Sequence, residues 1–156
     1  MRLPAEGPYT PPAEAAAPGG DRLALIAGAS HWFLNSMFAN VPAQLARAGE
    51  PAVALHPEDA AERGLADGDE VEIGNERGAF RARLVVGPTA RRGVAATTKG
   101  HWPKLLAGGT NVNAVVEERD ADLGGGAVFH DCAVWVRSAR VPASAVGSLA
   151  RWPSVS

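Results

Sequence analysis

The sequence is poor in cysteine and in long apolar runs, and its charges nearly balance. Its 156 residues include one cysteine, Cys132, which excludes an internal disulfide and every metal site that needs several cysteines. No run of about 18 apolar residues is present, so no segment is a candidate membrane span. With 15 basic and 17 acidic residues the formal net charge is −2, and no overall positive field favours nucleic acid or an anionic membrane.

Recognisable catalytic motifs are also missing. There is no Gly-x-Ser-x-Gly nucleophile motif and no phosphate loop ending in Gly-Lys-Ser/Thr. The four histidines, at 31, 56, 101 and 130, lack the His-Glu-x-x-His spacing of a zinc helix, although a metal site built from distant histidines stays an alternative. We therefore assign no catalytic residue and no metal ligand. The N-terminus shows no basic segment followed by an apolar stretch, so a cytoplasmic location is expected.

The composition divides the chain into three parts. Residues 1–22 hold five prolines and almost no large apolar side chain, which is typical of an extended lead-in. Residues 23–138 carry the apolar segments of a globular domain. Residues 139–156 are rich in Pro, Gly and Ser and are interpreted as a tail, whose Val141, Val146, Leu149 and Trp152 are able to pack onto the domain.

Short apolar or alternating segments separated by turn residues predict a β-rich domain with two or more short helices. Phe80, Ala82, Leu84 and Val86 alternate with Arg81 and Arg83, so the apolar set is expected to face inward. In the preceding hairpin connection, 75–78, Gly78 is expected to supply a positive φ. The predicted strands are 23–27, 52–55, 70–73, 80–86, 93–97 and 132–136; helices are predicted over 37–48, which contains Pro42, and over 57–63. Cys132 is interpreted as a small core residue. Six short strands of this kind indicate a barrel.

Three loops combine glycine, asparagine and aromatic residues at unusual density. They are residues 29–36, 108–113 and 124–131. Glycines let a backbone approach a ligand closely, asparagine offers a donor beside an acceptor for a pterin or purine edge, and Trp32 and Phe33 offer stacking faces. These loops are the candidate binding site.

The same residues carry a resemblance. Ser-His-Trp-Phe-Leu-Asn-Ser-Met, His-Pro-Glu-Asp-Ala-Ala-Glu-Arg-Gly-Leu-Ala-Asp-Gly-Asp-Glu-Val, Asn-Val-Asn-Ala and Phe-His-Asp-Cys-Ala-Val-Trp-Val follow one another in this order. The ordered set resembles the C-terminal molybdopterin-dinucleotide-binding domain of the dimethyl sulfoxide reductase family. The resemblance covers about residues 23–136 and implies a mainly β fold, a double-psi β-barrel like that of aspartate decarboxylase.

The resemblance also implies which residues bind the cofactor. The loop around His31 matches the stretch of the family that contacts the dinucleotide, Asn113 matches a pterin-binding asparagine, and His130 matches a cofactor-binding position that is often lysine. The region around Trp102 matches a loop near the substrate funnel in some members. Two departures stand out: Ala27 replaces a common arginine, and His130 carries a weaker, titratable charge than lysine. The expected cofactor-binding residues are Ala29, Ser30, His31, Trp32, Asn35, Ser36, Asn113 and His130.

The function implied is that of a domain or subunit of a molybdenum or tungsten oxidoreductase. It would hold bis-molybdopterin guanine dinucleotide together with the remainder of a catalytic chain, joined covalently or as a separate subunit, without supplying the metal ligand. The isolated chain is not expected to catalyse the electron-transfer reaction of such an oxidoreductase by itself. Two alternatives stay open: a cofactor-free double-psi barrel that acts as an adaptor, and a stand-alone barrel enzyme of the decarboxylase type. The latter needs a processed Gly-Ser bond, and the one present is Gly147-Ser148 in the tail.

Overall fold

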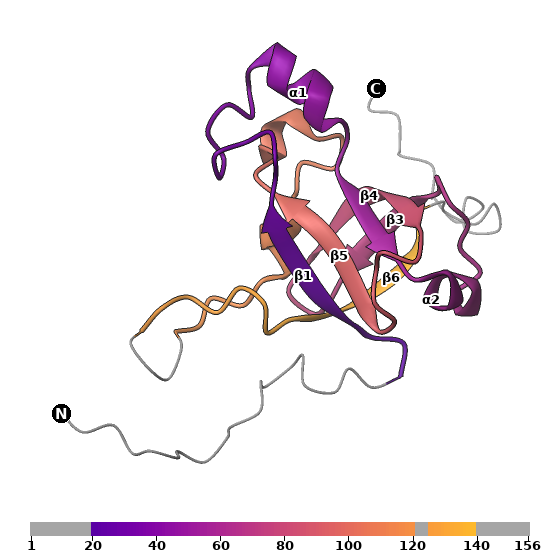
Figure 1. Ribbon diagram of the computed structural model, residues 1–156. Helices are drawn as coiled ribbons and strands as arrows, with labels where there is room; N and C mark the ends of the chain where they lie inside the picture. The colour runs from indigo at the N-terminus through magenta and orange to yellow at the C-terminus, as the bar shows by residue number, and fades with distance from the viewer. Residues whose placement is uncertain (1–19, 121–124, 140–156) are drawn as a thin grey trace, which may run out of the picture.

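Six short strands close into a barrel in the computed structural model, which describes residues 20–120 and 125–139 (Figure 1). Around the ring the order is β1-β5-β2-β4-β3-β6. All six predicted strands are present, with ends that move by no more than two residues. The strands are β1 (Leu23–Ala29), β2 (Ala52–Leu55), β3 (Glu70–Gly74), β4 (Ala79–Val86), β5 (Val94–Lys99) and β6 (Ala133–Ser138).

Two of the strand pairs are parallel and the other four are antiparallel. β1 runs parallel to β5 and β2 runs parallel to β4, whereas β1–β6, β2–β5, β3–β4 and β3–β6 are antiparallel. Parallel partners require crossover connections, so neither parallel pair is formed by neighbours in the sequence. Two parallel pairs in a closed mixed ring confirm the expected mainly β, double-psi barrel.

The barrel interior is filled by side chains from every strand. Leu25, Leu55, Ile73, Leu84 and Val134 are each no more than 1% exposed. The predicted alternation along β4 is confirmed: Phe80, Ala82 and Leu84 are buried, Val86 packs partly against the core, and Arg81 and Arg83 face outward. Cys132 is 1% exposed and unpaired with another cysteine, as expected for a small core residue.

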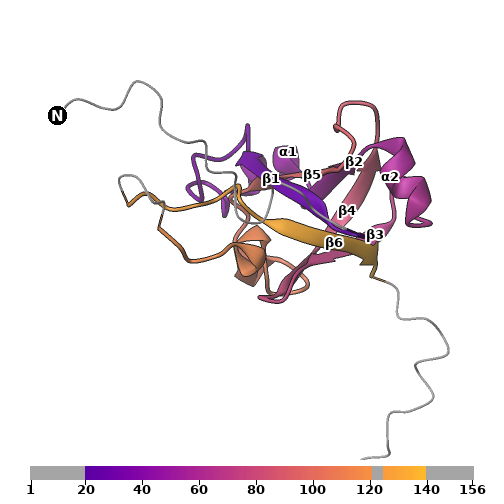
Figure 2. The ribbon, with the colours of Figure 1, turned by 90° about the horizontal axis from the view of Figure 1, so that it is seen from below.

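Two short helices and two 3₁₀ turns cover the ends of the barrel. The α-helices are α1 (Pro42–Ala48) and α2 (Pro57–Glu62), and the 3₁₀ turns are η1 (Pro103–Leu105) and η2 (Val112–Val115). Figure 2, seen from below, shows β6 across the near side of the barrel, α2 at one end, and the segment before β6 extending beyond the other.

The prediction of a helix over residues 37–48 is wrong for its first five residues. Pro42 occupies the first turn of α1, the position where its missing N–H and fixed φ are tolerated best. The chain before it is a series of turns in which Asn35 and Phe38 adopt positive φ values of 54° and 67°. Pro42 therefore begins the helix instead of interrupting it.

Gly78 is needed for a different reason from the one expected. The 75–78 connection is a hairpin turn, in which the N–H of Asn75 donates to the carbonyl of Gly78 at 3.0 Å. Gly78 does not adopt a positive φ. A Cβ at this position would lie 2.7 Å from the carbonyl oxygen of Ala114, so glycine allows the hairpin to approach η2 closely.

Asp59, an acidic residue in the first turn of α2, is buried. Its side chain is 5% exposed, and Oδ2 accepts a hydrogen bond from the N–H of Gly93 at 2.7 Å. The contact fixes α2 against the turn that leads into β5. Glu58 beside it is exposed and forms an ion pair with Arg92 at 2.6 Å.

We expect Asp59→Ala to lower the free energy of unfolding by about 1.5–3 kcal/mol, because the partly buried N–H of Gly93 loses a charged acceptor. Glu58→Ala is the matched control and should change it by less than about 1 kcal/mol, since an exposed ion pair contributes little. Urea unfolding of both variants measures the difference. Equal midpoints for the two variants would contradict the structural role of Asp59.

The expected lead-in, 1–22, and the expected tail, 139–156, lie almost entirely outside the described residues. Among the residues that are described, no helix has the length and apolar character needed to cross a membrane.

Candidate functional site

The carboxyl ends of β1 and β5 lie side by side and carry the first of the three polar loops. The parallel register pairs Ala29, the last residue of β1, with Lys99, the last residue of β5. Beyond these residues the two strands lead into the 30–41 loop and into Gly100 and His101 respectively. Segments about 70 residues apart in the sequence are thereby placed next to each other.

The 30–36 loop is held against the end of β5 by three contacts. Phe33 is 6% exposed, and its ring packs edge-on against His101 with the ring centroids 5.2 Å apart. The indole Nε1–H of Trp102 donates to the carbonyl oxygen of Ser36 at 2.7 Å. Gly100 has a φ of 114°, and a Cβ there would overlap the carbonyl oxygen of Asn35. The loop backbone is therefore fixed by its contacts with the residues that follow β5.

The loop presents its other side chains to solvent. His31, Trp32, Asn35 and Ser36 are exposed, and the Trp32 ring lies 4.9 Å from the His31 ring and 5.6 Å from the Arg47 guanidinium. Trp32 thus offers a stacking face beside a cation. Phe33 does not, because its ring is buried, and the prediction that both aromatic residues provide stacking faces is wrong for Phe33.

Asn113 lies on η2, next to the end of β5. Asn111 holds this turn in place: its Oδ1 accepts from the N–H of Asn113 at 3.0 Å, and its Nδ2 donates to the carbonyl of His101 at 2.7 Å. Asn111 is therefore the residue that caps η2. The Asn113 side chain is exposed and, within the part of the chain that the structure describes, makes no hydrogen bond.

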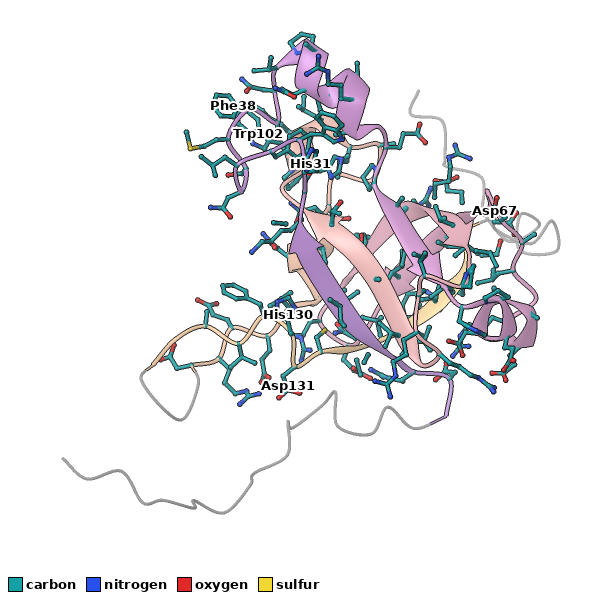
Figure 3. The ribbon with its side chains drawn as sticks, viewed as in Figure 1. His31, Phe38, Asp67, Trp102, His130 and Asp131 are labelled. Atoms are coloured by element: carbon teal, nitrogen blue, oxygen red, sulfur yellow. The ribbon has the colours of Figure 1, made fainter. Side chains whose placement is uncertain are left out.

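His130 is exposed at the end of the long connection that precedes β6. Its neighbour Phe129 lies with its ring 5.3 Å from the Nζ of Lys99. In Figure 3, His31 lies beside Trp102 below α1, whereas His130 lies further down, next to the orange connection. The 30–36 loop, the 111–113 turn and Phe129 each contact the segment from Lys99 to His101. His31 and His130 themselves are well separated, and their convergence on one ligand stays a prediction.

The connection before β6 is held by Arg119. Hydrogen bonds from its guanidinium to Glu117 at 3.0 Å and to Asp131 at 2.8 Å join the two sides of this connection. The bond to Glu117 and, next, that to Asp131 raise the pKa of Arg119 above its usual value. The Asp131 carboxylate is thus held by Arg119, whereas the adjacent side chain of His130 faces solvent.

Lys99 is a residue that the sequence alone does not single out. It is one of only two lysines in the chain, with Lys104. The register places it opposite Ala29, and its Nζ lies 5.3 Å from the Phe129 ring. The rarity of lysine is the one available signal. Its position becomes informative only once the pairing of β1 with β5 is known.

A sizeable cavity of the described residues is not formed by the expected cofactor-binding residues. It has a volume of about 640 Å³ and lies between α1, the outer face of β4 and residues 101–110. None of the eight expected residues lines it, although Trp102 and Gly108 do. In the same described part of the chain, no three His, Cys, Asp or Glu side chains are grouped so as to hold a metal ion.

The closed mixed barrel displays polar and aromatic loops at the ends of two parallel strands, an arrangement suited to a ligand-binding domain. The family model described as "Molydopterin dinucleotide binding domain" matches residues 23–133, and the chain belongs to this family. The resemblance recognised in the sequence is confirmed, and with it the cofactor class, a molybdopterin dinucleotide of molybdenum oxidoreductases. Family membership also decides against the adaptor and decarboxylase alternatives.

Relatives of known name are much longer than this chain. It is 32% identical over 110 residues to a putative catalytic subunit of dimethyl sulfoxide reductase from Halobacterium salinarum, a match that covers 70% of this chain and 13% of that protein. It is 34% identical over 115 residues to biotin sulfoxide reductase of Cereibacter sphaeroides, covering 72% and 16% respectively. Domains of this kind thus form a small part of larger catalytic chains.

A solved structure supports the fold. Acetylene hydratase from Pelobacter acetylenicus superposes with a TM-score of 0.64 at 18% sequence identity, over 74% of this chain and 18% of that one. At this identity the likeness concerns the barrel and not the chemistry of the enzyme.

Proposed function

We propose that this domain holds the dinucleotide arm of bis-molybdopterin guanine dinucleotide at the carboxyl ends of β1 and β5. The observation that carries the proposal is the exposed polar loop 29–36, which lies within the residues matched by the family model and is fixed from below by Phe33 and Trp102. A loop held in this way keeps its donors in place before the ligand arrives, which lowers the entropy cost of binding.

The residues around these strand ends fit such a ligand. Ser36, Asn35 and Asn113 provide exposed hydroxyl and amide groups, which suit the edge of a purine. Lys99 and His130 add side chains that are positive when protonated, and such groups attract phosphate oxygens. Ala27 is 6% exposed and faces the core, so the common arginine of the family has no counterpart there, and Lys99 is the residue best placed to supply the missing charge.

Each group has a separate task in this proposal. Asn113 binds the guanine edge, Trp32 stacks on a planar part of the ligand, and Lys99 and His130 contact the phosphates together with backbone N–H groups of the loop. Ala29 and Ser30 position the start of the loop; the Ser30 hydroxyl accepts from the N–H of Trp32 at 3.2 Å. When bound, the cofactor supplies the redox chemistry at its metal, and this domain orients it.

We further propose that the domain works with the remainder of a molybdenum or tungsten oxidoreductase, either within one chain or between separate subunits. The support is the length of the relatives, of which this chain spans 13% and 16% in the two cases above. A cytoplasmic location is part of the same proposal; it rests on the single cysteine, Cys132, because secreted domains often carry disulfides that need at least two.

Asn113→Ala tests the assignment of the guanine-binding group. We expect the variant to bind GDP about 2–10-fold more weakly than the wild type, because a hydrogen bond between two neutral groups, here an amide and the guanine edge, contributes about 0.5–1.5 kcal/mol. Isothermal titration calorimetry of the full 156-residue chain with GDP measures the affinity, and a separate titration with ADP tests whether the chain distinguishes guanine from adenine. The thermal midpoint should not move, since the side chain is exposed.

Asn40→Ala is the control, an exposed asparagine on the turn before α1. It should leave GDP affinity unchanged. Equal affinities in the Asn113 and Asn40 variants would contradict the role of Asn113, and a wild-type chain that does not distinguish GDP from ADP would contradict guanine recognition at this site.

A further inference from the structure

Exposed apolar side chains gather on one side of the barrel. Nine large apolar side chains are exposed among the described residues, and seven of them belong to β1, to the 30–41 loop that follows it and to the connection before β6. We call these seven the β1 face: Ile26, Trp32, Leu34, Met37, Phe38, Val41 and Phe129. Figures 1 and 2 both show the 30–41 loop and the connection on the same side of the barrel. Exposed apolar residues gathered in this way mark a contact surface for another molecule.

The 30–41 loop directs its apolar side chains outward. Leu34 and Met37 each donate their N–H to the carbonyl of the other, at 3.3 and 2.9 Å, so their side chains lie on the same side of the backbone. Phe38 has a φ of 67°, which a bulky residue rarely adopts, and in Figure 3 it lies at the outer edge of the loop, away from the barrel. The helix that follows, α1, buries none of its residues. These side chains are therefore available to a partner.

The loop end of the β1 face is positively charged. The sequence has no acidic residue in 22–49 or in 77–116, the two stretches that build this end of the barrel. Arg47 and Lys104 lie over the rings of Trp32 and Trp102, at 5.6 and 4.6 Å from the ring centroids. Within the described residues neither cation forms an ion pair with a carboxylate, so both are available to an acidic partner.

The other end of the face is negatively charged. It is formed by the arm, residues 117–120 and 125–131, which carries Phe129. Arg119 engages the carboxylates of Glu117 and Asp131. Glu118 and Asp120 are exposed and, in the part of the chain that the structure describes, have no ion-pair partner. The face thus has unpaired cations at one end, unpaired carboxylates at the other, and apolar side chains along it.

We propose that the β1 face binds the β1 face of a second copy of this chain about a two-fold axis. In such a pairing the same patch serves both partners, so the loop of each copy lies against the arm of the other. Arg47 and Lys104 of one copy then meet Glu118 and Asp120 of the other, and the contact occurs twice. Opposite charges at the two ends of one face are what a two-fold pairing requires, whereas an unlike partner requires no such arrangement. The proposal does not depend on cofactor binding.

Analytical ultracentrifugation of the full chain without nucleotide tests the pairing. We expect a monomer–dimer equilibrium with a dissociation constant of about 10 μM or less, the weak end for interfaces of ordinary size. Leu34→Asp with Phe38→Asp should weaken the dimer about tenfold or more, because carboxylates enter the apolar contact. Aspartate tolerates a positive φ better than phenylalanine does, so the loop itself is not disturbed at residue 38.

Val85→Asp is the matched control for the apolar contact. Val85 is 45% exposed on β4, which lies three strands from β1 around the closed ring. It makes the same chemical change away from the β1 face and should leave the dissociation constant unchanged.

Exchange of the charges gives a second, more specific test. One variant carries Arg47→Glu with Lys104→Glu, and the other carries Glu118→Lys with Asp120→Lys. Each alone should be monomeric, because like charges then meet at both contacts. An equimolar mixture should form a dimer with one copy of each variant, since opposite charges meet again, and native mass spectrometry identifies this species by its mass. Arg91→Glu, at an exposed arginine outside the face, should dimerise as the wild type does.

Three results would overturn the proposal. A wild-type chain that is monomeric at about 100 μM, tenfold above the expected dissociation constant, would leave the face to the remainder of an oxidoreductase or to another partner. Dimers that persist in both charge variants would show that a different surface pairs. A mixture that stays monomeric, with both variants folded by circular dichroism, would exclude the loop-to-arm contact. GDP affinity is measured separately, so failure here is distinct from failure of the proposed function.

Discussion

Replacing Gly100 with alanine is expected to lower the free energy of unfolding by about 3–5 kcal/mol, the upper end of what single substitutions do. Two effects add. Gly100 has a φ of 114°, a conformation that an L-residue adopts only with strain of about 1–3 kcal/mol. The new Cβ would also overlap the carbonyl oxygen of Asn35, and a backbone atom cannot rotate away as a flexible side chain can.

The same substitution should disturb the candidate binding loop. Asn35 lies between Phe33, which anchors the loop, and Ser36, which accepts from Trp102. Movement of the Asn35 carbonyl must therefore displace the exposed face of the loop, and GDP affinity should fall together with stability. Urea unfolding and calorimetry on the same protein preparation measure the two effects.

Gly109→Ala separates strain from overlap. Gly109 also has a positive φ, 65°, but no atom lies within 4 Å of the position that a Cβ would take. Its substitution should cost only about 1–2 kcal/mol, the strain of a left-handed residue. If the two glycine variants unfold at the same urea concentration, the close contact between Gly100 and the loop is not as described.

Asn75→Asp is expected to cost about 3–4 kcal/mol at pH 7. Asn75 is 8% exposed; its Nδ2 donates to the carbonyl of Val115 at 2.8 Å and lies 3.5 Å from the carbonyl of Ala133. Aspartate would place an acceptor where a donor is needed, so that a buried carboxylate faces two carbonyl oxygens. Removing a buried donor costs about 1–3 kcal/mol, and desolvation of the new carboxylate adds to this, although Arg77, whose Nε donates to the same carbonyl of Val115 at 3.0 Å, offsets part of the charge.

Asn40→Asp makes the same chemical change at an exposed position and should alter stability by less than about 0.5 kcal/mol. Thermal or urea unfolding compares the two. Because Asn75 ties the β3–β4 hairpin to η2, which carries Asn113, its substitution should also weaken GDP binding. A variant at Asn75 with wild-type stability would show that the buried hydrogen bonds contribute little.

The strands are predictable because alternation is a local property. β4 illustrates this: its apolar residues at every second position are buried and its arginines point outward. Local signals predict structure less reliably where one residue type is compatible with two different local structures. Pro42 is compatible with a helix interior only at the cost of a kink, and the structure uses it to begin the helix instead. Gly78 is typical of a special φ, yet its task is to let Ala114 approach.

The order of strands around the ring is not a local property, and the expectation of this barrel topology comes from the resemblance to a family. The same limit applies to the site. The composition of the 29–36 loop is sufficient to identify it, but composition does not tell which of two adjacent aromatic residues faces the core, and the prediction for Phe33 is wrong for that reason. Lys99 gains its importance from its register with Ala29, which no pattern within one segment reveals.

The pairing of β1 has a consequence for how the chain folds. Its partners are β5, where Ala24 lies opposite Val94, and β6, where Leu23 lies opposite Val134. During synthesis from the N-terminus, β1 is therefore the first of the six strands to be made, finds its first partner only when β5 follows, and has its second edge covered only when β6 is complete. Barrels dominated by such distant pairings fold in about milliseconds to seconds. A fragment that stops before β6 should leave an edge of β1 unpaired and should therefore aggregate. A chain that includes β6 should close the ring and leave no free strand edge.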